Sequence, residues 1–228
     1  MEKAATSQES FDPQCSRCAR LVALRRSMRQ RFPAYHNAPV APFGDRRPRL
    51  MIVGLAPGMH GANASGRPFT GDYAGIILYK TLYDFGFSSA PESVRRDDGL
   101  SLNGVKITNA VKCLPPENKP SLEEIKNCNR YLAVELQCLQ PGGVILALGK
   151  IAHDSVLRAL GCRMRDFPFG HGQEYRVEDR WWLIDSYHCS RYNTQTRRLT
   201  PEMFSGIFRR VKVLLGDSES GLDDRASC

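Results

Sequence analysis

A short apolar run followed by a glycine-rich loop constrains this chain more than any other feature. Residues 50–53, Leu-Met-Ile-Val, leave no polar face, which is typical of a strand buried on both sides of a parallel sheet. Five glycines and two prolines follow within residues 54–71 and let the backbone take positive φ angles and approach a ligand closely. Asp72 then begins a predicted helix, with Ile76 and Ile77 on its apolar face, that Gly86 ends. This order of elements places a ligand at the carboxyl end of a parallel strand.

The alternative interpretation of residues 54–71 is a structureless surface loop. Phe69 and Asp72 argue against it, because an aromatic ring and a carboxylate are groups that a binding loop presents. Each has a structural alternative of its own. Phe69 could be a core residue, and Asp72 stands where the N-cap of a helix is expected. We expect Asp72 to serve both as a cap and in the site.

The same plan of strand, loop and helix recurs along the chain and predicts an α/β fold. Apolar runs predict strands at residues 105–109, 144–148 and 181–184, and helical periodicity follows Ser121, Gly149 and Thr200. The face of the helix after Ser121 is expected to include Leu122. A basic helix is predicted at 19–31, a proline-rich extended connection after it, and a solvated loop at 88–100.

The length of 228 residues fits one domain, expected at 11–216, between polar and disordered ends at 1–10 and 217–228. The net charge of +8 favours a polyanionic partner. No apolar run approaches the length of a membrane span, and the first residues carry no signal-peptide core. We therefore expect a monomeric cytoplasmic protein that does not bind membranes.

Four of the eight cysteines are candidates for metal ligands. Cys15 and Cys18 form a C-x2-C pair, and Cys113 and Cys128 supply two more thiolates, enough for a zinc site or an iron–sulfur cluster. Spacing does not separate these two, and burial as small apolar residues is the alternative for all four. The remaining cysteines are expected to be simply buried or exposed: Cys138, Cys162, Cys189 and Cys228.

Four motifs in order resemble those of the family 5 (type b) uracil-DNA glycosylases. They are GLAPGMHGANASGRPFTGDY, ITNAVKCLPPENKP, the strand that ends in Ala-Leu-Gly-Lys, and SYHCSRYNTQTRRLT. Family 4 enzymes are similar but carry a glutamate where this chain has Leu55, which points to family 5. The resemblance spans residues 15 to about 215. It implies a three-layer α/β/α fold with a central four-stranded parallel sheet and a [4Fe-4S] cluster on the four candidate cysteines, with zinc as the alternative. It also implies excision of uracil from DNA, and of other deaminated bases such as hypoxanthine or xanthine.

The chemistry of base excision gives these motifs physical roles. The target base must leave the duplex, and an aromatic ring such as Phe69 can stack on it. Bond cleavage develops negative charge on the departing base, so His188, just after a strand, is the expected donor. The resemblance implies that Asp72 orients the water and assigns a catalytic asparagine to Asn118. Further base-site positions are expected at Gly54, Ala56, Gly58, Asn109 and Asn193.

The loop after His188 mixes cations with small polar residues, which suits contacts to DNA phosphates and a wedge beside the extruded nucleotide. The expected DNA-binding residues are Ser190, Arg191, Arg197 and Arg198. A solvated basic loop is the alternative. His60 is expected near the pocket, and His171 is expected to have no special role.

Two other functional classes are compatible with parts of the sequence. One is a catalytically weak nucleic-acid-binding module with a structural metal site, which Leu55 makes conceivable and which Asp72, Asn118 and His188 oppose. The other is a doubly wound nucleotide-binding enzyme. Residues 54–71 contain neither a GxGxxG nor a P-loop pattern, so the second interpretation is the weaker one.

Overall fold

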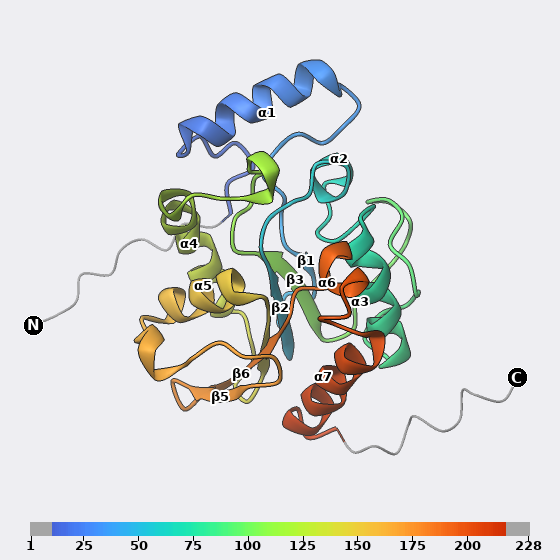
Figure 1. Ribbon diagram of the computed structural model, residues 1–228, viewed down its shortest axis with the longest axis vertical. Coiled ribbons are helices and arrows are strands. Elements are labelled where there is room, and N and C mark those ends of the chain that lie inside the picture. Colours follow the sequence, from blue (N-terminus) through green and yellow to red (C-terminus); the bar gives the residue numbers. More distant parts are fainter. Residues whose placement is uncertain (1–10, 218–228) are drawn as a thin grey trace, which may run out of the picture.

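The structure is a computed structural model that describes residues 11–217 (Figure 1). The helices are α1 (Ala19–Arg31), α2 (Ala62–Ser65), α3 (Tyr73–Asp84), α4 (Leu122–Leu136), α5 (Lys150–Leu160), α6 (Arg191–Gln195) and α7 (Pro201–Leu214), with short 3-10 turns at Pro116–Asn118 and Met164–Asp166. The strands are β1 (Phe43–Gly44), β2 (Leu50–Gly54), β3 (Val105–Asn109), β4 (Val144–Leu148), β5 (Glu174–Val177) and β6 (Trp181–Ser186).

The strands of the described chain form one sheet in the order β1-β3-β2-β4-β6-β5. The inner pairs β3-β2, β2-β4 and β4-β6 are parallel, whereas β1 and β5 are antiparallel edge strands. The α/β prediction is confirmed. The sheet has two strands beyond the four expected, because β1 lies in the predicted proline-rich connection and β5 lies where no strand was predicted.

Alternating residues of the inner strands face opposite helical layers. Leu50 and Ile52 of β2 pack in the core that α3 and α7 cover, while Met51 and Val53 pack in the core beneath α4 and α5. Figure 1 shows the sheet between these two helical pairs. Because both faces are buried, the central strands β2 and β4 carry no polar side chain, and polar groups gather at the carboxyl ends of the parallel strands.

Three predicted helix starts are confirmed by their caps. Asp72 accepts a hydrogen bond from the Gly75 amide at 2.8 Å at the start of α3. Ser121 and Glu124 form a reciprocal capping box at the start of α4. Thr200 accepts from Met203 at the start of α7. These bonds satisfy amides that have no partner within a helix, which fixes where the loops before the helices end.

Some local expectations were wrong. Ile76 and Leu122, both assigned to apolar faces, are 64% and 58% exposed. The loop at 54–71 contains the one-turn helix α2. The loop at 88–100 is not simply solvated, since its Ser88 and Leu100 are buried. Helical spacing identifies a face, but it does not show how far the neighbouring layer extends over that face.

The expected disordered ends, 1–10 and 217–228, lie outside the described residues except for Asp217. That residue accepts a hydrogen bond from Arg49 at 2.7 Å. Division of the chain into one domain at 11–216 stays a prediction. Within residues 11–217, no helix combines the length and the apolar character that crossing a bilayer requires.

Candidate active site

A cavity of about 410 Å³ opens where β2, β3 and β6 end, within the size range of small-molecule sites. Most of the predicted site residues line it: Ala56, Gly58, Phe69, Asp72, Asn109, Asn118, His188, Ser190 and Arg191. They come from three loops that are distant in sequence. The parallel sheet brings these loops together because each one follows the carboxyl end of a parallel strand, and these ends lie at the same edge of the sheet.

Phe69 and His188 face each other at this cavity. Their ring centroids are 6.0 Å apart and the ring planes differ by 28°. Phe69 is only 5% exposed and has a positive φ of 54°, which is unusual for a bulky residue. A Cβ atom at Gly54 would lie 2.5 Å from the Phe69 Cζ atom, so the Phe69 ring packs directly on this glycine. Gly54 therefore supports the part of the cavity wall that Phe69 forms.

His188 is held from its backbone side. The Asn193 side-chain amide donates to the His188 carbonyl at 2.8 Å, and a Cβ at Gly149 would lie 3.5 Å from the His188 Cβ. Burial lowers the pKa of His188 to about 4. The imidazole is therefore neutral at pH 7 and carries one N–H that can donate. Asn193 thus supports His188 and is not part of the cavity lining, and its role as a base-site residue stays a prediction.

The two carboxylate oxygens of Asp72 lie in different surroundings. Its Oδ1 caps α3, while a Cβ at Gly61 or Gly58 would lie 2.6 Å or 3.8 Å from Oδ2. Glycine at these positions leaves room for the second carboxylate oxygen. Burial raises the pKa of Asp72, although the amides of Gly75 and Ala74 oppose that rise. A half-buried carboxylate at a cavity wall is suited to orient a water molecule.

Two asparagines line the cavity from different loops. Asn109, at the end of β3, is buried, and a Cβ at Gly54 would lie 2.5 Å from its Oδ1. Its own carbonyl accepts from the buried Lys112 Nζ at 2.8 Å, which fixes the backbone there. Asn118 is exposed and has a positive φ of 56°, a conformation that asparagine tolerates. An amide can both donate to and accept from the edge of a base.

The predicted DNA-binding residues divide into two groups. Ser190 and Arg191 line the cavity, and the Arg191 guanidinium lies 5.1 Å from the centre of the Tyr73 ring. Arg198 packs over Tyr187 at 4.6 Å, and Arg197 has a positive φ of 57°, both outside the cavity lining. Arg191 therefore places positive charge at the cavity itself.

Sequence reasoning missed four residues that line the cavity: Leu55, Ala62, Tyr73 and Ala74. Tyr73 could have been found, because it directly follows Asp72 in the same motif. His60, expected near the cavity, bonds through Nδ1 to the Tyr35 hydroxyl at 3.0 Å instead. His171 accepts from the Tyr187 amide and stacks on its ring.

The four candidate cysteines line a separate cavity between α1 and α4. They pack with an apolar group that includes Leu21, Val111 and Tyr131. Ala56 also contacts this group and lines the first cavity, so the two sites share a wall. Of the other cysteines, Cys138 is exposed, Cys189 is buried and Cys162 is intermediate, while Cys228 lies outside the described residues.

The environment of the thiols fits a positively charged or iron-containing group. Burial, with the neighbouring thiols, raises the pKa of Cys113 to about 12, and burial raises that of Cys128 to about 11. The Lys112 amide donates to the Cys128 sulfur at 3.2 Å, and the Asn127 side chain donates to Cys18 at 3.8 Å. The N–H donors directed at two sulfurs suit a bound metal centre, whose positive charge would offset the cost that burial places on ionising these thiols. Among residues 11–217, no three His, Cys, Asp or Glu side chains stand in the geometry of a single-ion site.

Comparison with known proteins agrees with this arrangement. The family model of the uracil DNA glycosylase superfamily matches residues 41–212. A type-5 uracil-DNA glycosylase of Thermus thermophilus is 46% identical over 207 residues, which cover 89% of this chain and 94% of the relative. A type-5 enzyme of Pyrobaculum aerophilum is 42% identical, with 89% of each chain covered. A type-4 enzyme of Archaeoglobus fulgidus is 31% identical over 79% of this chain and 84% of the relative.

Proposed function

The chain belongs to the uracil DNA glycosylase superfamily, and we propose that it excises uracil from DNA by hydrolysing the bond between base and sugar. The family 5 resemblance of its motifs is confirmed by the type-5 relatives. The single observation that carries the mechanism is that the Phe69 ring lies against the His188 ring at a cavity that Asp72 also lines. These retained groups disfavour a catalytically weak binding module.

The target base leaves the duplex and enters the cavity beside Phe69. Unstacking and unpairing oppose this step, and stacking on an aromatic ring recovers about 1–3 kcal/mol. Gly54 permits the Phe69 ring to lie close to the strand end, where Asn109 can read the base edge. The loop after β2 thus supplies a stacking surface for the base, and the end of the adjacent strand β3 supplies a polar group for its edge.

Cleavage of the bond moves an electron pair onto the base and leaves positive charge on the sugar. The neutral His188 imidazole donates a hydrogen bond to the base oxygen that gains charge. The Asp72 carboxylate stabilises the sugar cation and orients the water that completes hydrolysis, leaving an abasic site. Asn118 contacts that water or the base from the opposite loop.

DNA contacts are assigned to the basic loop that follows His188. Arg191 at the cavity and Arg197 and Arg198 beyond it contact phosphates, as does Ser190, which caps α6 directly before Arg191. Because each phosphate contact releases counterions, affinity falls as salt is added. The protein is expected to act on DNA as a monomer in the cytoplasm, associated with the nucleoid.

The range of bases extends to other deaminated bases such as hypoxanthine and xanthine. The cavity of about 410 Å³ is large enough for a pyrimidine or a purine base, and both polar and apolar residues line it. Asn109 biases the site toward uracil, because a buried amide is left unpaired when the base edge does not match it. Uracil is therefore the preferred substrate.

A [4Fe-4S] cluster is assigned to Cys15, Cys18, Cys113 and Cys128, with a single zinc ion as the alternative. The shared cavity and the N–H donors at two sulfurs support this ligand set. When bound, the group supplies a covalent crosslink between the segment before α1 and the loop after β3. That loop joins the cysteines to Asn109 of the active site.

Incubation of the purified protein with DNA that contains one uracil, followed by alkali to cleave abasic sites, tests the activity. The wild type should cleave at the uracil position, and His188→Ala should be slower by about 10²- to 10⁴-fold. Release of no deaminated base by the wild type would support a binding module instead.

A further inference from the structure

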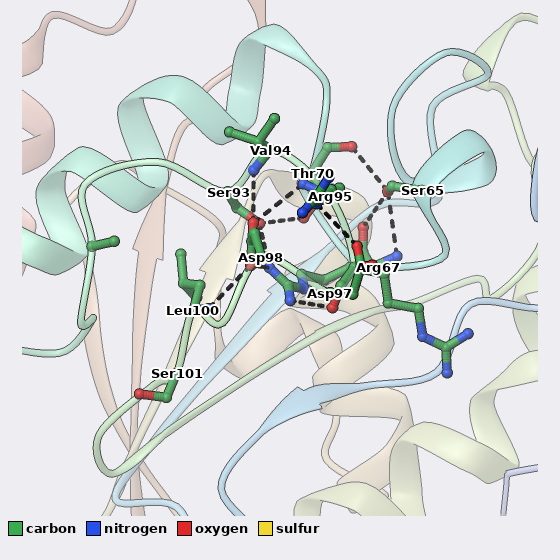
Figure 2. A network of polar contacts seen from close by, with 12 residues as sticks. Ser65, Arg67, Thr70, Ser93, Val94, Arg95, Asp97, Asp98, Leu100 and Ser101 are labelled. Atoms are coloured by element: carbon green, nitrogen blue, oxygen red, sulfur yellow. Dashed lines mark hydrogen bonds and ion pairs between the residues drawn. The ribbon is translucent and has the colours of Figure 1, made fainter.

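A buried arginine lies two residues before Phe69 and bonds to a distant loop. Arg67 Nη1 donates to Asp98 Oδ1 at 2.7 Å and to Ser93 Oγ at 2.9 Å, and Nη2 donates to the Arg96 carbonyl. The Arg67 side chain is 4% exposed, and its guanidinium lies 4.4 Å from the centre of the Phe43 ring. Figure 2 shows the two segments facing each other across these bonds.

Asp98 organises its own loop as well as the arginine. Its Oδ2 accepts from the amides of Val94 and Arg95, and its Oδ1 accepts from the Leu100 amide at 3.0 Å. Burial opposes ionisation of Asp98, but the bonds from Arg67 and from these amides outweigh it and lower its pKa to about 2. The carboxylate is therefore charged at every working pH, and the turn around it is closed.

Hydrogen bonds also hold the residues directly before and after Phe69. The Thr70 and Ser93 hydroxyls are 2.7 Å apart, and the Tyr79 hydroxyl donates to the Pro68 carbonyl at 2.9 Å. A Cβ at Gly75 would lie 1.9 Å from the Phe69 carbonyl oxygen, so α3 presses on the same peptide. Phe69 keeps its positive φ because the residues before and after it are fixed from outside.

The loop of Asp98 also approaches the site directly. Ser93 and Val94 line a second cavity, which shares Asp72, Tyr73 and Arg191 with the first. Ser93 thus contacts Arg67, Thr70 and this second cavity.

We propose that Asp98 is a positioning residue which, through Arg67 and Ser93, holds the Phe69 ring where an extruded base can stack on it. This inference depends on the proposed function. Asp98 lies outside the cavity lining, so its effect on the reaction passes through Phe69. Misplacing a substrate-positioning group by about 1 Å can lower a rate about 100-fold, even when the altered residue is far from the chemistry.

The test uses Asp98→Asn and Ser93→Ala in the full chain. The amide that Asp98→Asn introduces would turn an N–H group toward either Arg67 or the Val94 and Arg95 amides, whereas Ser93→Ala removes only the hydroxyl between Arg67 and Thr70. The matched control is Asp97→Asn, since Asp97 pairs with Arg95 at 3.2 Å but both side chains are more than 70% exposed.

The substrate is an oligonucleotide with one uracil and a neighbouring 2-aminopurine, whose fluorescence rises when the uracil leaves the stack. Both readouts are measured at a temperature well below the unfolding temperature of each variant. Asp98→Asn is expected to lower the single-turnover excision rate about 10- to 100-fold and to reduce the rise in 2-aminopurine fluorescence. Ser93→Ala should change both readouts in the same direction but less. Asp97→Asn, and binding of all variants to uracil-free DNA, should stay within about twofold of wild type.

Combination with Phe69→Ala separates positioning from general support of the fold. If Asp98 acts through Phe69, the double variant should excise uracil less than about twofold more slowly than Phe69→Ala alone. An equal loss in both backgrounds, or wild-type rates in folded Asp98→Asn and Ser93→Ala, would overturn the proposal. A wild type that releases no uracil would instead refute the proposed function.

Discussion

The ring centroids of Phe69 and His188 lie 6.0 Å apart, with the ring planes close to parallel, although the two residues are 119 positions apart in the sequence. Phe69 comes from the loop after β2, and His188 comes from the loop after β6. These strands are not adjacent, since β4 lies between them. The two rings meet because all three strands are parallel and direct their following loops to one edge of the sheet.

Phe69→Leu should weaken catalysis more than it weakens the fold. Leucine keeps most of the apolar volume but removes the ring, and stacking contributes about 1–3 kcal/mol per base. We expect kcat/KM on uracil-containing DNA to fall about 5- to 150-fold, at about 1.4 kcal/mol for each factor of ten. Steady-state kinetics on a short oligonucleotide measure this fall.

Phe204→Leu is the matched control, because Phe204 is fully buried in the same core on α7. It should lower the free energy of unfolding by about 1 kcal/mol and leave kcat/KM unchanged. Equal kinetic losses in the two variants would mean that the Phe69 ring only fills the core.

The sequence predicted those parts of the site that are determined by residues close together in the chain. Apolar runs indicated β2 and β4, and side-chain caps at Asp72 and Thr200 placed the helix starts. The motif after β6 placed His188 at a strand end. Each of these features is set by residues within a few positions of one another, so the sequence is sufficient to identify them.

The parts that the sequence did not predict depend on distant partners. The strand β1 has two residues and exists because Phe43 pairs with Ile107 of β3. Local composition places Asp98 in a solvated loop, but it bonds to Arg67, 31 positions away. Nothing in the composition of either segment identifies its partner. Buried polar pairs of this kind become visible only when the topology is known.

The pH dependence of excision should show an acidic limb only. The pKa of His188 is about 4, below its ordinary value of 6.5, so the neutral donor persists through pH 6.5 and is lost only as pH falls through about 4. Burial raises the pKa of Asp72, so its carboxylate is also lost as pH falls. Loss of the Asp72 carboxylate lowers kcat/KM toward acid, whereas the imidazolium form of His188 still carries N–H groups that can donate.

A pH profile of kcat/KM from 4 to 8 checks this expectation. In His188→Gln the amide can still donate but does not titrate, so the remaining acidic limb should belong to Asp72 alone. Activity that declines as pH rises through 6 to 7 would contradict the assignment, because it would mean that the imidazolium form of His188 is the donor.

Asn109→Ala should relax the choice of base. Asn109 is buried in the cavity lining, its side-chain Oδ1 lies against Gly54, and its backbone is fixed by Lys112. Removing an amide that pairs with the uracil edge should lower the rate on uracil about tenfold. The rate on hypoxanthine, which matches that edge less well, should fall less.

The ratio of single-turnover rates on uracil and hypoxanthine oligonucleotides measures this change. Asn103→Ala, at an exposed position before β3, is the control and should leave both rates unchanged. A uracil to hypoxanthine ratio in Asn109→Ala equal to that of the wild type would show that Asn109 does not discriminate between the bases.

Cys113→Ser should remove the metal centre, whereas Cys138→Ser should retain it. Cys113 lines the cavity with Cys15, Cys18 and Cys128, while Cys138 is exposed at the end of α4. Iron and sulfide analysis should find about four of each per wild-type chain and per Cys138→Ser chain. One zinc per chain would contradict the cluster, and no metal would contradict the ligand set.

Loss of the cluster should also lower stability, because metal-binding free energy is part of the folding free energy when the ligands come from distant segments. We expect Cys113→Ser to lower Tm by roughly 10 °C, given about 2–4 °C for each kcal/mol in a chain of this size. Excision should weaken as well, since Ala56 contacts the cysteine group and lines the active cavity. Unchanged Tm and rate in a metal-free Cys113→Ser would show that the shared wall does not depend on the metal.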